Sequence, residues 1–406
     1  MKTSVAEKFL SLISHDTQSA HDADTSPSTA KQLDFAYILA EECKSVGLSE
    51  VTVNGHGLVT ATLHANADVE DVIGFIAHMD TSPDFSGANV SAQIVYNYDG
   101  GNIVLNSYLT LSPDEFPELL GYTGQTIITT DGNTLLGADD KAGIAEILAA
   151  MEYFIQHPEI PHGKVRIAFT TDEEVGRGTD NFDIGAFGAS YGFTVDGGGI
   201  GELEYENFNA ARVVYDITGK SVHPGQAKGI MKNAGLIATE LISQFPQNET
   251  PATTEGREGY YHLCSMTANV EHARLDYRIR DFDEEGLNKR KAFAEMAAET
   301  INFRYGKGTV GLKVQDEYRN MKCKIDEYPK IIDLARRAYA KAGLETKETP
   351  IRGGTDGAKL SFMGLPCPNI FTGGHNYHGP YEYIPVESME KAVEVIVNIC
   401  VLETGN

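Results

Sequence analysis

Residues 72–80 read VIGFIAHMD, an apolar run that ends in a histidine and an aspartate. The uncharged run 72–77 is short and predicts a buried β-strand that ends at His78. The same arrangement recurs twice, with acidic residues directly after an apolar run, at 165–174 and 193–196. Strands buried on both faces are typical of parallel sheets. Since ligands of such sheets bind beyond the carboxyl ends of the strands, we expect the polar residues that follow these runs to converge.

Helical segments separate these strands, and the alternation predicts the class of fold. Residues 142–154 have a strongly helical pattern, and another helix is expected to start at Ser26-Pro27 and to stop at Gly47. Polar, tyrosine-rich segments at 90–133 predict one or two inserted hairpins. This order predicts an α/β fold in which a mainly parallel, mixed sheet is sandwiched by helices.

The pattern changes between about residues 208 and 319. A strand, a helix, two strands, a helix and a strand follow one another there, which is the order of a ferredoxin-like α+β domain. A chain of 406 residues is also too long for one ordinary hydrophobic core. We therefore expect a first domain in two parts, 1–207 and 320–406, with a second domain inserted at 208–319.

Composition excludes several classes of protein. The formal net charge of −25 repels phosphate backbones, so we expect no nucleic-acid partner. Five cysteines without a C-x-x-C pair fit a reducing cytosol better than a disulfide framework. The first residues lack the pattern of a signal peptide, and no apolar run reaches the length of a transmembrane helix. We therefore expect a cytoplasmic protein without a membrane partner.

Five potential metal ligands follow strand-like runs or lie in glycine-rich turns. Two are histidines and three are carboxylates: His78, Asp140, Glu174, Asp196 and His378. Imidazoles and carboxylates suit zinc, and three carboxylates with one hydroxide balance the charge of two Zn²⁺ ions. Singly, these residues have ordinary explanations, because Asp139-Asp140, for example, lies where acidic residues cap a helix. Spacing also leaves open whether His375 or His378 is the ligand in GGHNYHG.

Further acidic residues accompany these ligands. Asp80 lies two residues after His78, where a carboxylate can accept the second ring N–H of a ligating histidine. Three consecutive carboxylates at 172–174 repel one another unless a cation is close. We expect Glu174 to be a ligand and Glu173 to be an unligated general base, which would take a proton from water and pass it to a leaving amine.

Three other residues are candidates for substrate binding. His223 precedes a Pro-Gly turn that exposes it, and an imidazole there can stabilise an oxyanion. Arg280 and Arg352 can each bind a carboxylate through two N–H groups. The structural alternatives are an ordinary surface histidine and ordinary salt bridges to the many acidic residues.

The order of the motifs is more specific than any one of them. HMD, ADDKAG, TTDEE, VDG, VHPG, RGGTDG and a late glycine-flanked histidine follow one another along essentially the whole chain. This order resembles the di-zinc aminoacylase/carboxypeptidase superfamily of metallopeptidases and, within it, the tripeptide aminopeptidases. The resemblance implies a zinc-exopeptidase-like fold whose inserted domain is a lid or dimerisation domain.

The resemblance also implies a cofactor, partners and a role for each candidate residue. It implies two Zn²⁺ per subunit, an activated hydroxide, tripeptide substrates and a homodimer. By this resemblance, Asp140 bridges the two zinc ions. His78 and Asp196 then ligate one ion, and Glu174 and His378 ligate the other. Asp80 orients His78, Glu173 is the acid–base catalyst, and the substrate is bound by His223, Arg280 and Arg352.

Related and unrelated activities are the alternatives. A dipeptidase, another exopeptidase or an N-acyl-amino-acid hydrolase would use the same metal set, because specificity depends on the shape of the pocket. A non-catalytic protein with a structural metal would not need the unligated Glu173 beside Glu174. A calcium-binding protein would favour oxygen ligands, and the chain has no EF-hand loop.

Overall fold

The computed structural model describes residues 4–405, and the chain forms two compact units. Unit 1 is formed by residues up to 205, by 323–349 and by those from 355 onward, and unit 2 by 206–322 and 350–354. The insertion expected at 208–319 lies inside unit 2. Residues 350–354 also belong to unit 2, which no local pattern of the sequence indicated.

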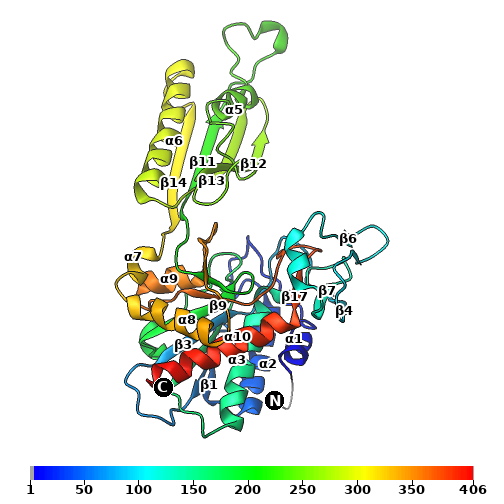
Figure 1. Ribbon diagram of the computed structural model, residues 1–406. Coiled ribbons are helices and arrows are strands. Elements are labelled where there is room, and N and C mark those ends of the chain that lie inside the picture. Colours follow the sequence, from blue (N-terminus) through cyan, green and yellow to red (C-terminus); the bar gives the residue numbers. More distant parts are fainter. Residues whose placement is uncertain (1–3, 406) are drawn as a thin grey trace. The chain divides into compact units, whose positions relative to one another are not determined.

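Unit 1 is built on an eight-stranded sheet (Figure 1). In sheet order the strands are β1 (Ser49–Val53), β2 (Val59–Leu63), β8 (Val165–Thr170), β3 (Ile73–His78), β9 (Tyr191–Gly197), β16 (Asn369–Phe371), β10 (Glu202–Glu204) and β15 (Lys347–Glu348). β8, β3, β9 and β16 are parallel neighbours, whereas β2 and β10 pair with them antiparallel. Strands β3 and β8 are buried along their whole length, as their apolar runs predicted. The predicted α/β class with a mixed sheet is confirmed.

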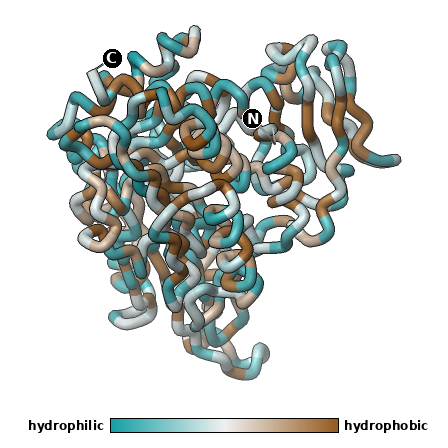
Figure 2. Tube along the Cα trace, turned by 90° about the horizontal axis from the view of Figure 1, so that it is seen from below, coloured by the Kyte–Doolittle hydropathy of each residue, from teal (hydrophilic) through white to brown (hydrophobic). Residues whose placement is uncertain are grey.

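Helices flank this sheet, and α3 is the central one. The helices of unit 1 are α1 (Val5–Leu12), α2 (Ala30–Val46), α3 (Ala138–Gln156), α4 (Ile184–Phe187), α8 (Pro329–Lys341), α9 (Asp356–Met363) and α10 (Val386–Glu403), and α7 (Lys322–Ile325) starts at the unit boundary. α3 packs against β3 and β9 and also against α1 and α10, so it is buried on most sides. Hydrophobic residues recur along the strands and helices of the fold (Figure 2).

The start of α2 differs from the prediction, but its end does not. The helix begins at Ala30 with Thr29 in the N-cap position, three residues after the Ser26-Pro27 peptide. Ser26-Pro27 therefore lies in the segment before the helix. Gly47 ends the helix with φ 105°, a left-handed conformation that glycine adopts without strain.

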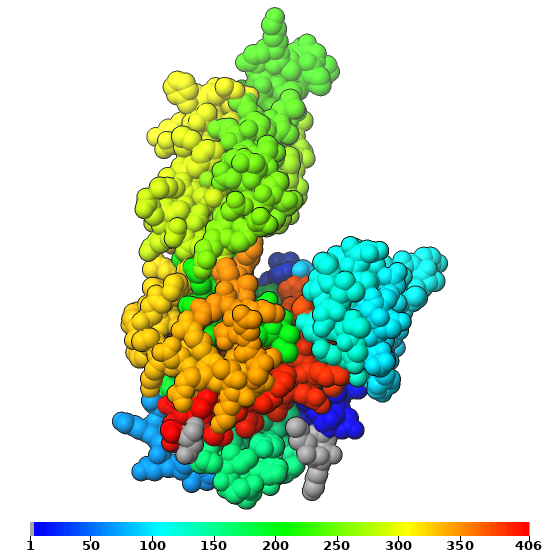
Figure 3. Space-filling view, in the orientation of Figure 1, coloured from blue at the N-terminus to red at the C-terminus, as the bar shows by residue number. Residues whose placement is uncertain are grey.

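A small lobe of unit 1 contains the tyrosine-rich segment, coloured cyan in Figure 3. β4 (Ala92–Val95), β7 (Ile127–Thr130) and β17 (Tyr383–Pro385) form a sheet in the order β17-β7-β4, and β5 (Ile103–Val104) pairs with β6 (Thr110–Leu111) before the 3-10 helix η1 (Pro117–Tyr122). Two antiparallel pairs lie in the range 90–133, where one or two hairpins were expected: β5 with β6, and β4 with β7. Because β7 pairs with the C-terminal strand β17, the lobe also anchors the segment that carries His375 and His378.

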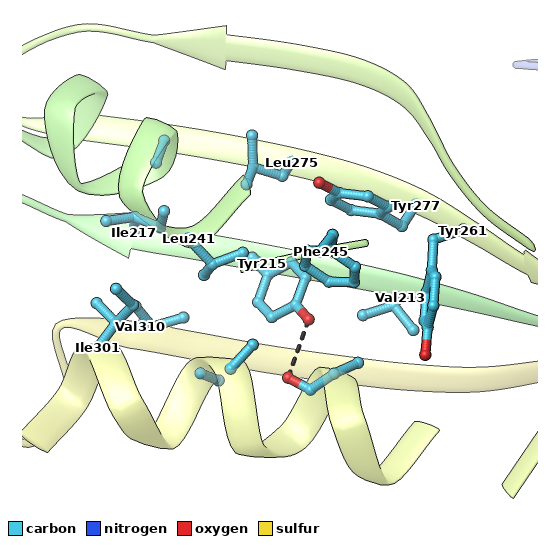
Figure 4. Close-up of a cluster of buried hydrophobic side chains, with 14 of the residues drawn as sticks. Val213, Tyr215, Ile217, Leu241, Phe245, Tyr261, Leu275, Tyr277, Ile301 and Val310 are labelled. Carbon is cyan, nitrogen blue, oxygen red and sulfur yellow. Dashed lines mark hydrogen bonds between the residues drawn. The ribbon is translucent and has the colours of Figure 1, made fainter. Parts of the chain in front are cut away.

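Unit 2 has the predicted β-α-β-β-α-β order. Its elements are β11 (Asn209–Thr218), the 3-10 turn η2 (Pro224–Gln226), α5 (Ala234–Ile242), β12 (Tyr260–Ala268), β13 (His272–Asp281), α6 (Glu284–Tyr305) and β14 (Val310–Tyr318). The antiparallel order β12-β13-β11-β14 is the ferredoxin-like arrangement. Aromatic side chains fill its core (Figure 4): the rings of Phe245 and Tyr277 stack 4.6 Å apart, and the Tyr215 hydroxyl donates to the Ala294 carbonyl at 2.9 Å.

Candidate metal centre and active site

Parallel pairing brings three predicted strand-end residues to one edge of the unit 1 sheet. β3 lies between β8 and β9, and the register pairs His78 with Thr170. Glu174 follows β8 after a short turn, and Asp196 lies at the penultimate position of β9. The sheet order therefore explains why residues far apart in sequence meet here.

A cluster of histidine and carboxylate groups lies at this edge. Potential ligand atoms within 4.8 Å of one another belong to two sets, His78 with Asp139 and Glu174, and His78 with Asp140 and Asp196. The Nε2 atom of His78 is 2.8 Å from Asp139 Oδ1 and 3.6 Å from Asp196 Oδ1. Four of the five residues expected from the sequence are therefore in these sets, and Asp139 joins them.

Asp139 lies between the two imidazoles that were predicted as ligands. Its Oδ1 is 2.8 Å from His78 Nε2, and its Oδ2 is 3.2 Å from His378 Nε2. His378 Nε2 is also 3.0 Å from Glu174 Oε2. Asp139 thus contacts both histidines, although the sequence suggested a helix cap at this residue and a bridging role for Asp140.

Asp140 is fully buried within the cluster, but both oxygens of its carboxylate accept backbone N–H groups. Its Oδ2 accepts the N–H of His78 at 3.0 Å, and its Oδ1 accepts the N–H of Gly143 at 3.2 Å. A Cβ atom on Gly143 would lie 2.5 Å from Asp140 Oδ1 and 2.0 Å from the Val195 carbonyl, so only glycine fits. These contacts tie the start of α3 to β3 and β9. The motif ADDKAG holds two adjacent aspartates, and nothing in its spacing shows which of them faces the histidines.

Asp80 connects the first histidine with the acidic turn after β8. The Nδ1 atom of His78 lies 3.0 Å from the Asp80 carbonyl oxygen and 3.5 Å from its Oδ1. The Asp80 carboxylate accepts the N–H of Glu173 at 3.0 Å and that of Glu174 at 3.2 Å. The orientation of His78 therefore involves the Asp80 backbone at the shorter distance, while the carboxylate holds the two glutamates.

Asp172, the first of the three consecutive carboxylates, does not join the cluster. It has φ 61°, a left-handed conformation that is uncommon for residues other than glycine but that aspartate adopts more readily than most. Its carboxylate accepts the N–H of Ser28 at 2.7 Å and the amide of Gln32 at 2.8 Å. Asp172 thus anchors the turn to the start of α2, and only Glu173 and Glu174 of the triplet follow towards the cluster.

The two late histidines have different surroundings. His378 Nε2 contacts Asp139 and Glu174, as described above. His375 instead lies in the lobe, where its Nε2 is 2.6 Å from the Tyr122 hydroxyl and its ring stacks on Tyr383 at 5.0 Å. Burial lowers the pKa of His375 to about 4, so this ring is neutral at physiological pH. The geometry therefore separates the two histidines, which spacing alone did not.

Burial and mutual repulsion shift the pKa values of the cluster. Burial, together with the charge of Asp139, raises the pKa of Glu174 to about 8 and that of Asp196 to about 6. Burial also raises the pKa of Glu173 well above its usual range, and neighbouring carboxylates add to the shift. For His378, burial lowers the pKa, but Asp139 and Glu174 outweigh it and raise the value to about 11. The raised pKa values of these carboxylates indicate that their negative charges lie close together in a buried place, with too little positive charge nearby.

This donor set fits divalent cations. Imidazole nitrogen and carboxylate oxygen are ligands that Zn²⁺ takes in proteins. Among residues 4–405, the buried Oε1 atom of Glu174 has no hydrogen-bond partner, which is costly unless another group satisfies it. A cation between the carboxylates would satisfy that oxygen and reduce the repulsion.

His223 lies in unit 2, on an exposed turn. Its Nδ1 accepts the N–H of Gly225 at 3.2 Å, at the start of η2. In the neutral ring the proton is then on Nε2, which can donate to a developing oxyanion. The predicted exposure of His223 by the Pro-Gly turn is present.

The two predicted substrate-binding arginines make their contacts within unit 2. Arg280 Nη1 donates to Glu317 Oε2 at 3.1 Å, and its guanidinium lies 5.1 Å from the Tyr318 ring centroid. Arg352 Nη1 donates to the Gly256 carbonyl at 2.7 Å. Both guanidinium groups therefore already donate hydrogen bonds to acceptors within the chain. Their role in binding a substrate carboxylate stays a prediction.

Comparison with known proteins gives the family. Residues 128–401 match peptidase family M20/M25/M40. The chain belongs to this family. The M20/M25/M40 assignment makes the protein a peptidase, and relatives support it along the whole length. The chain is 55% identical to peptidase T of Halothermothrix orenii over 97% of this chain and 98% of that one, and 55% identical to peptidase T of Geobacillus thermodenitrificans over 98% of each.

Solved structures share the M20/M25/M40 fold. Aminopeptidase PepT of Bacillus cereus ATCC 10987 superposes with a TM-score of 0.76 at 26% identity, covering 99% of this chain and 98% of that one. A Staphylococcus aureus tripeptidase has a TM-score of 0.78 at 22% identity with the same coverage. A dinuclear metal-binding M20 peptidase of Bacillus subtilis has a TM-score of 0.66 at 15% identity, covering 98% of this chain and 97% of that one.

Among residues 4–405, no helix is long and apolar enough to span a bilayer.

Proposed function

We propose that this M20/M25/M40 peptidase is a zinc-dependent aminopeptidase that removes the N-terminal residue from tripeptides. The observation that carries the proposal is the Asp139 carboxylate, which contacts both His78 and His378. The relatives named peptidase T and the tripeptidase of similar fold support tripeptides as the substrate class.

Two zinc ions per subunit would share the Asp139 carboxylate. The other ligands would be His78 with Asp196 for one ion and Glu174 with His378 for the other. This proposal replaces Asp140 as the bridge, because both oxygens of Asp140 already accept backbone N–H groups. Bound zinc would act as a Lewis acid that makes water more acidic and polarises the scissile carbonyl.

Glu173 would be the general base and then the general acid. Its backbone is held by Asp80, which also holds Glu174, so the base and a ligand keep a fixed spacing. A raised pKa suits a carboxylate that takes a proton from the attacking water and returns it to the leaving amine. The Nε2–H group of His223 would stabilise the oxyanion. Arg280 and Arg352 are the proposed contacts for the substrate carboxylate.

A homodimer and a cytoplasmic location complete the proposal. Both rest on the resemblance and on composition. Light scattering on the zinc-loaded protein would test the first, and a mass equal to one chain at micromolar concentration would contradict it.

Hydrolysis of a peptide panel tests the substrate. The zinc-loaded protein would receive Ala-Ala, Ala-Ala-Ala, Ala-Ala-Ala-Ala, N-acetyl-Ala-Ala-Ala, N-acetyl-Ala and Ala-Ala-Ala-amide, with products identified by mass. We expect release of N-terminal alanine from the free tripeptide and weak cleavage of the amide, which lacks the carboxylate that the arginines would bind. Preference for the dipeptide or for an acetylated substrate would replace the tripeptide assignment with a related activity. No cleavage by a protein that holds two metal ions would refute the enzyme proposal.

A further inference from the structure

Glu382 is a buried carboxylate of unit 1 that the sequence did not single out. It is 1% exposed and lies four residues after His378, directly before β17. Four consecutive backbone N–H groups donate to its two oxygens, those of Leu136 (2.7 Å), Gly137 (3.0 Å), Ala138 (2.7 Å) and Asp139 (3.2 Å). Each oxygen accepts two of these bonds, so both lone pairs of each carboxylate oxygen are occupied.

The four amides lie in the turn that leads into the regular part of α3, because Gly137 is left-handed and Asp139 and Asp140 depart from helical φ/ψ angles. Buried backbone N–H groups need a hydrogen-bond partner, and here a carboxylate from a distant part of the chain accepts all four. Since one donor is the N–H of Asp139, the contact fixes the peptide unit that carries the proposed bridging carboxylate.

The backbone around Glu382 is fixed as well. Its carbonyl accepts the Thr129 hydroxyl of β7 at 3.1 Å, and its N–H donates to the Gly379 carbonyl at 3.3 Å. The next residue, Tyr383, exchanges two backbone hydrogen bonds with His375, at 2.9 Å and 3.1 Å. The turn that carries His378 is therefore held by the lobe sheet, and the Glu382 side chain joins it to the start of α3.

We infer that Glu382 is a positioning residue, which holds Asp139 and His378 at the spacing that the metal centre requires. The inference rests on the proposed function, because it concerns the ligands named there. Asp139 Oδ2 and His378 Nε2 are 3.2 Å apart, and they belong to the two segments that Glu382 joins. Groups that orient metal ligands from outside the coordination sphere typically contribute about 10–100-fold to metal affinity.

The variant Glu382→Gln tests this role. The amide keeps the shape of the side chain but places an NH₂ group against two of the four donors. Glu387→Gln is the matched control, because the Glu387 carboxylate also accepts a backbone N–H, that of Thr126 at 3.0 Å, but in a segment without a proposed ligand. The measurements are zinc affinity by chelator competition, the visible absorption spectrum of the Co²⁺ form, and kcat and KM for the tripeptide.

We expect Glu382→Gln to lower zinc affinity about 10–100-fold, to alter the Co²⁺ spectrum and to lower kcat more than KM changes. Glu387→Gln should match the wild type in all three. Wild-type affinity and an unchanged Co²⁺ spectrum in Glu382→Gln would overturn the inference, whatever happens to its Tm.

If Glu382→Gln does not fold, Thr129→Val is the second variant, because it removes only the hydroxyl that donates to the Glu382 carbonyl. It should weaken zinc several-fold, and unchanged affinity there would equally overturn the inference. Absence of zinc binding by the wild type would instead refute the proposed function.

Discussion

The two units differ in the surroundings of their carboxylates. In unit 2, Arg290 Nε donates to Asp281 at 2.8 Å and Arg280 Nη1 donates to Glu317 at 3.1 Å, so carboxylates and guanidinium groups of the same fold neutralise one another. At the sheet edge of unit 1, several carboxylates crowd around two imidazoles, and the pKa of Glu174 rises to about 8. These carboxylates of unit 2 have cationic partners in the chain itself, whereas the carboxylates of the unit 1 cluster form a donor set that could hold a cation.

The largest expected effect concerns Glu173, a carboxylate in unit 1 that is not a proposed ligand. Glu173→Gln keeps the size of the side chain but cannot take a proton from water. We expect kcat to fall by about 10³-fold or more, while two metal ions stay bound. Metal analysis and tripeptide kinetics on the same sample check this. Near-normal turnover at full metal occupancy would remove Glu173 from the mechanism.

The next effect separates the two adjacent aspartates of unit 1. Asp139→Ala should lose at least one metal ion and about 10²-fold or more in activity, because a proposed shared ligand disappears. Asp140→Ala should retain more metal but unfold at a lower temperature, because the buried N–H groups of His78 and Gly143 lose their acceptor. Metal content and Tm of both variants check the assignment. Full metal in Asp139→Ala with loss of metal in Asp140→Ala would restore Asp140 as the bridge.

His223 is the group of unit 2 for which we expect a functional rather than a structural effect. It is exposed and makes one local hydrogen bond, so His223→Ala should leave Tm and metal content unchanged. Loss of an oxyanion donor should lower kcat about 10²-fold. His262→Ala, an exposed histidine on β12, is the control. Equal kinetics in the two variants would exclude His223 from catalysis.

The smallest effect is a pH dependence confined to unit 1. Without metal, Glu174 and Asp196 have raised pKa values in the folded state, about 8 and about 6, against 4.5 and 3.8 for the unperturbed groups. The folded state then binds more protons than the unfolded chain, so stability should fall as pH rises from about 5 to 8. The raised pKa of His378 acts in the same direction.

Bound zinc would take the place of those protons, so the zinc-loaded protein should lose less stability over the same range. Thermal unfolding of chelator-treated and zinc-loaded samples at several pH values checks the sign. A metal-free Tm that increases between pH 5 and pH 8 would show that these carboxylates are not crowded as described.

Local patterns predicted much of this fold because its strands and helices have clear periodicity. The buried strands β3, β8 and β9 lie where the apolar runs predicted them, and the element order of unit 2 follows from alternating patterns in its own sequence. The five residues 350–354 join unit 2 only through tertiary contacts, such as the hydrogen bonds of Arg352 with Thr254 and Gly256, which leave no periodic signal.

The sequence motifs predicted where the histidine and carboxylate cluster lies, but not which individual side chains contact one another. Asp139 and Asp140 are neighbours of the same type, and the backbone conformation at the start of α3 decides which of them faces the histidines. Glu382 had no motif at all, because its partners lie 243 to 246 residues earlier in the chain. Its glutamate looks like any surface acid in a chain with 58 acidic residues.

The position of β16 in the large sheet has a consequence for synthesis on the ribosome. β16 lies between β9 and β10, so the sheet of unit 1 cannot close before residues 369–371 have emerged. The strands and helices of the unit 2 core are complete by residue 318. Because domains fold as units while the chain grows, the inserted domain can reach its native form on the nascent chain first. The proposed ligand His378 emerges later still, so the proposed metal centre can form only after both parts of unit 1 have been synthesised.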